Sequence, residues 1–168
     1  RPELKCYGRS QMITPNLDEL AATGMLFERT YCQQAVCSPS RTSLLTGLRP
    51  DSTQVYDLQT HFRDKVPDVV TLPEHFRNNG YFATGIGKMY HGGLGDKRSW
   101  SEPYLKCGGR GYVEEDNTNW VRKVVQERKA KGHRRPGYAA YSFPFEDADV
   151  PDTTYRDGAM AEAVEKHL

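Results

Sequence analysis

Cys37 opens a stretch in which nucleophilic, charged and conformationally special residues follow one another at short intervals. Residues 37–47 read Cys-Ser-Pro-Ser-Arg-Thr-Ser-Leu-Leu-Thr-Gly. Pro39 suits the first turn of a helix, so Cys37 is expected at a helix N-terminus, where backbone amides favour an anion. Arg41 follows one helical turn later and carries a permanent charge. This order of residues predicts a nucleophile beside an anion-binding site.

Lys88 follows a predicted buried strand over residues 81–86, and His91 lies three residues further on. In α/β proteins with parallel strands, functional groups gather at the carboxyl ends of the strands. Taken singly, Cys37 is more often a small buried side chain, Arg41 and Lys88 are solvated charges, and His91 is a loop residue. The place of Lys88 at the end of a predicted strand is nevertheless typical of an active site.

Local signals predict the elements that position these residues. A second strand is expected over residues 25–31, and helix and strand units joined by glycine-marked turns predict an α/β sandwich with a largely parallel central sheet. The expected helices are one that Thr14 caps and Gly24 ends, one over residues 38–46 that Gly47 ends, and one that begins with the capping-box pair Thr71 and Glu74 and stops at Gly80.

Residues 92–150 form a loosely patterned region with several turn signals. One amphipathic helix is expected through Trp120 and Val125, among polar loops that would shape a substrate cleft. A final helix is expected after Asp157, which could cap it. The whole of residues 1–168 is interpreted as the N-terminal portion of a single catalytic domain, with residues 92–150 as a loop-rich insertion.

Composition narrows the class of partner. The 23 Lys and Arg residues nearly balance the 22 Asp and Glu residues, which argues against a nucleic-acid-binding protein. The basic run at residues 128–135 is interpreted as a solvated helix end. No stretch approaches the roughly 18 apolar residues of a transmembrane helix, and the four irregularly spaced cysteines support neither a zinc site nor a disulfide framework.

Residues 37–47 resemble the sulfatase signature C-x-P-S-R-x-x-x-L-T-G at all of its specified positions. The similarity is greatest to the iduronate-2-sulfatase-like group. It implies an alkaline-phosphatase-like α/β fold and a catalytic formylglycine at Cys37. The flanking blocks that carry the same resemblance are Arg1-Pro2 with Cys6-Tyr7-Gly8, residues 14–18, and residues 87–91, with a weaker one at residues 149–152.

The resemblance also implies roles for the other site residues. A maturation enzyme, the formylglycine-generating enzyme, would oxidise Cys37 to an aldehyde whose hydrate attacks sulfur. Arg41 would steady the formylglycine and its negative neighbours. Lys88 would bind a sulfate oxygen, and His91 would hydrogen-bond the diol and act as a base in its collapse, so that both also bind substrate.

Sulfatases of this type bind one Ca²⁺ ion through acidic residues that have no counterpart in this sequence. Cys37, as formylglycine, is the only candidate metal ligand among its residues. Because calcium takes six to eight oxygen ligands, the chain alone is expected neither to hold Ca²⁺ tightly nor to turn over substrate. The first strand and a signal segment are also expected to lie outside this sequence.

The resemblance predicts a sulfuric ester hydrolase that removes sulfate from a sulfated sugar such as a glycosaminoglycan. One alternative is a phosphonate or phosphate monoester hydrolase of the same superfamily. Another is an inactive truncated copy that binds sulfated glycans. Because sulfated glycans are extracellular, periplasmic or lysosomal, the full-length protein is expected in one of those locations.

Overall fold

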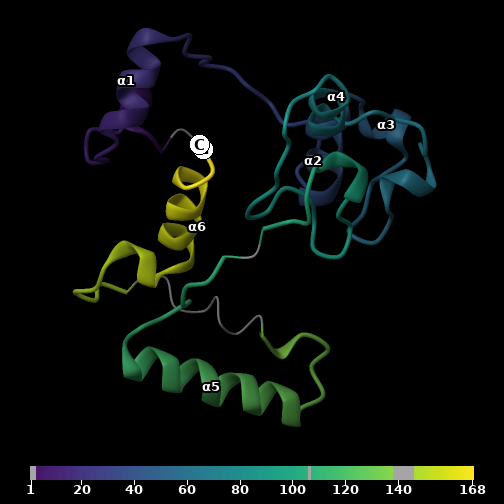
Figure 1. Cartoon of the computed structure of the whole chain (residues 1–168). Helices are drawn as coiled ribbons and strands as arrows, with labels where there is room; N and C mark the ends of the chain where they lie inside the picture. Colours follow the sequence, from purple (N-terminus) through teal and green to yellow (C-terminus); the bar gives the residue numbers. More distant parts are fainter. Residues whose placement is uncertain (1–2, 106, 138–145) are drawn as a thin grey trace.

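The computed structural model describes residues 3–105, 107–137 and 146–168, and helices are its main elements. Figure 1 shows α2, α3 and α4 gathered in one lobe, with α1 and α6 on one side of it and α5 on another. No helix in these ranges is long and apolar enough to cross a membrane. The helices are α1 (Pro15–Thr23), α2 (Cys37–Thr46), α3 (Pro50–Thr53), α4 (Leu72–Asn78), α5 (Glu115–Ala130) and α6 (Arg156–Glu165), with short 3₁₀ turns η1 (Lys5–Tyr7), η2 (Phe62–Asp64), η3 (Lys97–Ser99) and η5 (Asp152–Thr154).

Helix α2 carries the signature residues and forms as predicted, with its first helical residue at Cys37. Gly47 ends it in the left-handed conformation, with φ 71°, and its amide donates to the Ser43 carbonyl at 2.9 Å. The buried face of the helix consists mostly of small and polar residues. Its buried residues are Ser38, Pro39, Thr42, Ser43 and Leu45.

Helix α4 confirms the predicted capping box. The Thr71 hydroxyl accepts from the Glu74 amide at 3.3 Å, and the Glu74 carboxylate accepts from the Thr71 amide at 3.4 Å. Both residues are buried, so the cap also fixes the start of α4 within the lobe. The helix ends before Gly80, as the glycine signal predicts.

Helices α1, α5 and α6 also lie where they are expected, but two predicted caps are wrong. The Thr14 hydroxyl accepts from the Lys5 amide at 3.3 Å and donates to the Asp18 carboxylate at 3.2 Å, and it caps no amide of α1. Asp157 lies inside the first turn of α6, and the residue at the cap position is Tyr155, without a side-chain cap bond. Polar residues near a helix start have several partners within reach, so sequence spacing alone does not select one.

Both strand predictions are wrong, because no strand forms in the described ranges. Residues 25–31 have no ladder, and Met25 and Phe27 remain 78% and 63% exposed. Residues 81–86 are extended, but they pair with one irregular neighbour: Ser101 and Leu105 donate to carbonyls only two residues apart, at 2.7 and 2.9 Å. A strand needs a regular partner to form a ladder. The predicted central sheet is therefore not formed in the described part of the chain.

The core of the lobe is a small aromatic and aliphatic cluster. Phe62 stacks on Tyr90 with ring centroids 5.9 Å apart, and Tyr90 meets the edge of Trp100 at 6.3 Å. Leu45 brings α2 into the same cluster. Since Tyr90 is adjacent to His91, this packing fixes the segment that carries the predicted site residues.

Candidate active site

The structure brings Cys37 and His91 together. Nδ1 of His91 lies 3.2 Å from Sγ of Cys37, which is hydrogen-bonding distance for a sulfur atom. Cys37 begins α2 and His91 comes from the loop after the predicted strand, so two separate elements build the pair. Both side chains are partly exposed. An imidazole in this place can give a proton to, or take one from, a group at position 37.

Arg41 holds the backbone of the loop that carries Lys88. Its guanidinium Nη1 donates to the Lys88 carbonyl in a short contact and lies 3.3 Å from the Met89 carbonyl. Charge-assisted bonds of this kind are stronger than neutral ones. Arg41 therefore joins α2 to the loop by contacts to main-chain atoms, one turn along the helix from Cys37.

Tyr104 holds the same loop by its other backbone groups. The Tyr104 hydroxyl accepts from the Met89 amide at 3.0 Å and donates to the Gly87 carbonyl in a short contact. The two bonds bracket Lys88, so the main chain is fixed on both sides of the residue predicted to bind substrate. A phenol can do both because its oxygen donates and accepts.

Gly85 makes this position of Tyr104 possible. A Cβ atom at Gly85 would lie 2.5 Å from Cε2 of Tyr104 and 3.0 Å from Cε2 of Trp100. The two rings meet edge to face at 5.9 Å and cover the glycine backbone. An isolated glycine inside a strand-like pattern often marks such a close approach.

A buried polar network supports the loop from behind. The Ser99 hydroxyl lies 2.8 Å from the Tyr90 hydroxyl and donates to the Asp96 carboxylate at 2.7 Å. Arg63 pairs with both Asp96 and Glu74 at 2.8 Å. These bonds tie η3, η2 and the start of α4 to the residue that precedes His91, so its position depends on the fold of the whole lobe.

The network also changes the titration of its members. Burial favours the neutral form of each carboxyl group, but the hydrogen bonds from Arg63, from Ser99 to Asp96 and from Arg98 to Glu74, together with the charge of Arg63, outweigh it and lower the pKa values of Asp96 and Glu74 below their usual range. Arg98 adds a second hydrogen bond to Glu74. Burial raises the pKa of the Tyr90 phenol, because the phenolate is costly to desolvate. Both carboxylates are therefore held ionised beside Arg63.

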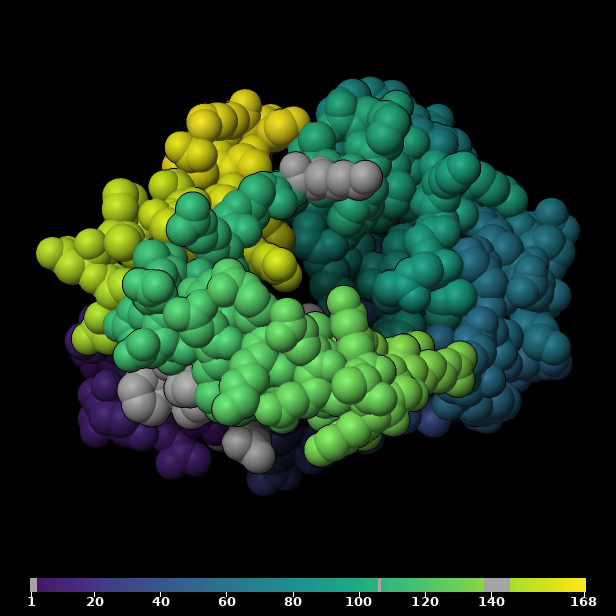
Figure 2. Space-filling model, turned by 90° about the horizontal axis from the view of Figure 1, so that it is seen from below, coloured from purple at the N-terminus to yellow at the C-terminus, as the bar shows by residue number. Residues whose placement is uncertain are grey.

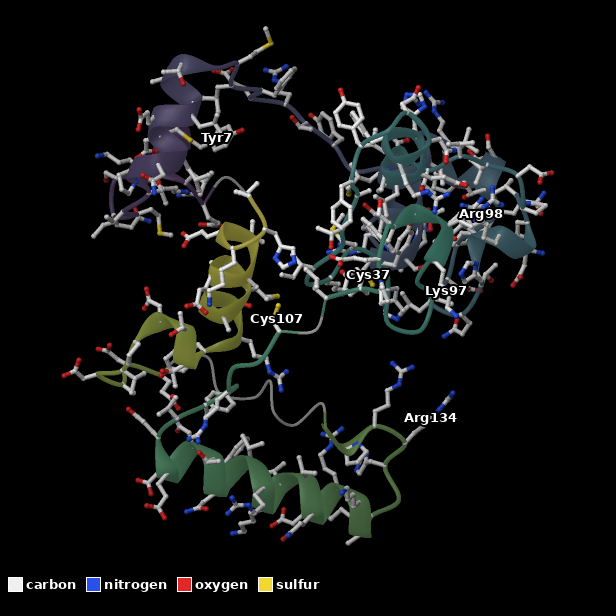
Figure 3. All side chains as sticks on the ribbon, viewed as in Figure 1. Tyr7, Cys37, Lys97, Arg98, Cys107 and Arg134 are labelled. Carbon is white, nitrogen blue, oxygen red and sulfur yellow. The ribbon has the colours of Figure 1, made fainter. Side chains whose placement is uncertain are left out.

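A cavity of about 1190 Å³ lies beside the pair. Lys88 and His91 line the cavity. Cys37 does not line it, but its sulfur atom contacts His91, which does. The Lys88 ammonium makes no hydrogen bond or ion pair with any residue that the structure describes. Figure 3 shows Cys37 at the side of the lobe that faces α6, and Figure 2 shows the molecule hollowed between α5 and the lobe. The cavity thus offers a cation and an imidazole beside the residue at position 37.

The described residues do not fit a calcium site. Within them, no group of three or more His, Cys, Asp or Glu side chains is close enough to hold a metal ion. Cys37 and His91 offer sulfur and nitrogen, whereas calcium prefers many oxygen ligands. No step of the chemistry is therefore derived through a metal.

All four predicted site residues come from two segments that the structure places together. Cys37 lies beside His91, and Arg41 contacts the backbone of Lys88. Sequence analysis missed Tyr104, which holds the loop, and the Arg63 network. Gly85 is the signal that could have indicated a close approach at this point. The network partners of Arg63 are 11 and 33 positions away, and no local pattern joins them.

Comparisons of the sequence with known proteins identify a family. The family model described as Sulfatase matches residues 1–156. Iduronate 2-sulfatase of Mus musculus is 36% identical over 162 residues, which cover 96% of this chain and 28% of that protein. A sulfatase of Formosa agariphila is 32% identical, over 85% of this chain and 29% of that protein. Arylsulfatase A of Bos taurus is 39% identical, over 61% and 20%. The chain spans less than a third of each relative.

Proposed function

The chain belongs to the sulfatase family, and from this premise we propose that its full-length protein hydrolyses a sulfate ester of a sugar with Cys37 matured to formylglycine. The observation that carries the proposal is the pairing of Cys37 with His91 beside Lys88, within the signature C-x-P-S-R-x-x-x-L-T-G. Family membership implies an alkaline-phosphatase-like fold. The largely parallel sheet of that fold remains part of the proposal.

In this proposal Cys37 is the precursor of formylglycine, and its thiol is not the nucleophile. One hydroxyl of the hydrated aldehyde attacks the sulfur atom, the bond from sulfur to the sugar oxygen breaks, and the alcohol leaves with a proton. The second hydroxyl then loses its proton, the aldehyde forms again, and sulfate leaves. A thiol would instead be left as an S-sulfonate. The diol closes the cycle without a second nucleophile.

The neighbouring residues supply charge and proton transfer. His91, at 3.2 Å from the sulfur that the diol would replace, accepts the proton that starts the collapse. Lys88 offsets negative charge on the sulfate oxygens, and its ammonium is available because no described residue pairs with it. Arg41 holds the Lys88 loop in place through the contacts to its carbonyls and adds positive charge near position 37.

The sugar, the metal and the location belong to the proposal for the whole protein. Its relatives in the comparisons include an iduronate 2-sulfatase and an arylsulfatase A. We propose a glycosaminoglycan or similar sulfated carbohydrate as substrate, Ca²⁺ bound with residues beyond this sequence, maturation by a formylglycine-generating enzyme, and export from the cytosol.

Tryptic mass spectrometry of the peptide Thr30–Arg41 tests the proposal. The chain is expressed with and without a formylglycine-generating enzyme and then alkylated. We expect residue 37 to carry the aldehyde mass with the enzyme present, while Cys32 in the same peptide is alkylated in both samples. Alkylation of both cysteines with the enzyme present would contradict the proposal. An Arg41→Lys variant provides a matched test of the signature.

Turnover by the full-length protein separates the ester classes. A sulfatase hydrolyses an aryl sulfate faster than the matching aryl phosphonate, and a phosphonate hydrolase of the same superfamily shows the reverse order. A Cys37→Ala variant of the full-length protein, which has no nucleophile, is the control for both substrates. Retention of a sulfated oligosaccharide without hydrolysis by the matured protein would instead indicate a glycan-binding protein.

A further inference from the structure

A second cavity adjoins the first at the carboxyl end of α5. It has a volume of about 480 Å³, and Arg135 lines both cavities. In Figure 3, Lys97 lies at the edge of the lobe nearest α5, and Arg134 lies at the end of α5 nearest the lobe. Lys97 lines the first cavity and Arg134 lines the second. A line of cations therefore runs from the candidate active site to the end of α5.

The turn after α5 creates the second cavity. Gly132 is in the left-handed conformation with φ 70°, and the His133 amide donates to the Arg128 carbonyl at 3.0 Å. The turn reverses the chain, so that Arg134 lines the same cavity as Arg128, which belongs to the last turn of α5. Gln59, from the loop before η2, also lines the cavity.

The second cavity carries positive charge that its own walls do not neutralise. Its lining has no acidic residue. Nε of Arg128 is buried and has no hydrogen-bond partner among the described residues. No ion pair joins Arg128, His133 or Arg134 to a carboxylate in those ranges. A guanidinium without an anionic partner binds an anion favourably.

The first cavity differs, because its acidic residues already have partners. Asp96 pairs with Arg63, and the Glu102 carboxylate accepts from the Thr84 hydroxyl at 2.8 Å. Lys88 and Lys97 therefore contribute cations to the first cavity. Two cavities with a shared arginine can hold two anionic groups of one ligand.

We propose that the second cavity is a subsite for a further anionic group of an extended sulfated glycan whose terminal sulfate lies at Lys88. This inference rests on the proposed function. The proposed substrate is a glycan chain with an anionic group on successive sugars, and not a small molecule with one sulfate ester. Arg128 and Arg134, with their planar donor forks, bind the sulfate or carboxylate of a following sugar.

Binding of size-defined heparin oligosaccharides to the 168-residue chain tests the inference. We expect affinity to rise with length until both cavities are filled. Arg128→Gln with Arg134→Gln lowers the affinity for the longer oligosaccharides by roughly fivefold for each arginine and leaves the disaccharide unaffected. The double variant also lowers the slope of log affinity against log salt by about one per lost contact. The matched control is Lys129→Gln, an exposed cation of α5 that lines neither cavity.

The outcomes test the subsite and the proposed function separately. An equal loss from Lys129→Gln, or no dependence on length, overturns the subsite. Equal competition by an unsulfated polyanion such as polyglutamate also overturns it. If Lys88→Gln weakens every length and the arginine variants weaken none, the active site stands without the subsite. If only the arginine variants weaken binding and Lys88→Gln has no effect, the subsite stands and the proposed function fails. Far-ultraviolet circular dichroism confirms that each variant is folded.

Discussion

Sγ of Cys37 and Nδ1 of His91 lie 3.2 Å apart, although 54 positions separate the two residues. The pair forms because α2 packs into the core of the lobe and because four backbone contacts hold the loop that ends at His91. Arg41 makes two of these contacts from α2, and Tyr104 makes the other two.

Arg41→Gln removes the charge-assisted bonds to the Lys88 and Met89 carbonyls. We expect the free energy of unfolding to fall by about 1.5–3 kcal/mol, with partial recovery in Arg41→Lys. Denaturant titration measures the change. Arg49→Gln changes an exposed arginine that does not hold the loop; it is the matched control and is expected to be nearly neutral. Equal losses from the two variants would refute the loop-holding role.

Tyr104→Phe keeps the ring and removes the hydroxyl that brackets Lys88. We expect hydrogen exchange at the Met89 amide to accelerate roughly fivefold, since a neutral hydrogen bond contributes about 1 kcal/mol. Exchange followed by mass spectrometry reports the change. Tyr56→Phe, which loses an exposed hydrogen bond to Asp51, is expected to leave that amide unchanged. An unchanged Met89 amide in Tyr104→Phe would argue against the bracket.

Gly85→Ala places a Cβ atom 2.5 Å from the ring of Tyr104. The ring must move, so we expect a loss of about 1–3 kcal/mol in unfolding free energy and faster exchange at Met89. Gly92→Ala is the control, because no atom lies within 4 Å of the added group. A stable Gly85→Ala variant with an unchanged loop would show that the rings are free to move aside.

Acid should destabilise the lobe through Asp96 and Glu74. Their folded pKa values are lowered, so the unfolded chain binds more protons as the pH falls through the ordinary carboxyl range near 4. The stabilisation is present above that range and is lost as the pH falls toward the folded pKa values. Unfolding free energies measured between pH 7 and pH 3 should decline, and Asp96→Asn with Glu74→Gln should flatten the decline.

Arg63→Gln leaves both carboxylates buried without their shared cation. Loss of one partner of a buried pair costs about 3–5 kcal/mol. The surface pair Lys166 and Glu162 provides the contrast, since Lys166→Gln should cost no more than about 0.5 kcal/mol. Similar unfolding midpoints for the two variants would contradict the assigned role of the network.

Calcium is expected to bind the 168-residue chain no more tightly than millimolar. No cluster of three metal-binding side chains forms within the described residues, and oxygen ligands are absent from the pair at position 37. Isothermal calorimetry and the unfolding midpoint with and without chelator measure this. Micromolar binding, or a midpoint that falls on chelation, would refute the expectation.

The helices were predictable because their signals are local. The Thr71 and Glu74 box and the Gly47 stop lie within a few residues of the elements that they define. The signature places Cys37 and Arg41 on one helix, and the structure has them there. Lys88 was predicted from its place after a strand-like run and His91 from the family resemblance, although that run pairs irregularly and forms no strand.

Contacts between distant segments were not predictable. Arg63 lies 33 positions from Asp96, and Tyr104 lies 15 positions from Met89. The hydrophobic pattern of a segment indicates which of its faces is buried, but it does not indicate which other segment packs against that face. The strands failed for the same reason, because a run of β-formers such as residues 25–31 becomes a strand only beside a partner of matching register.

The buried inner face of α2 sets an order of events for maturation. Ser38, Pro39 and Thr42 are packed inside the lobe, so a modifying enzyme cannot grip the signature as an extended peptide once the helix has docked. If Cys37 is matured as proposed, its oxidation has to compete with folding in time. Under that proposal a chain that folds early would escape modification, and slower folding or tighter capture of the nascent segment would raise the fraction of modified molecules.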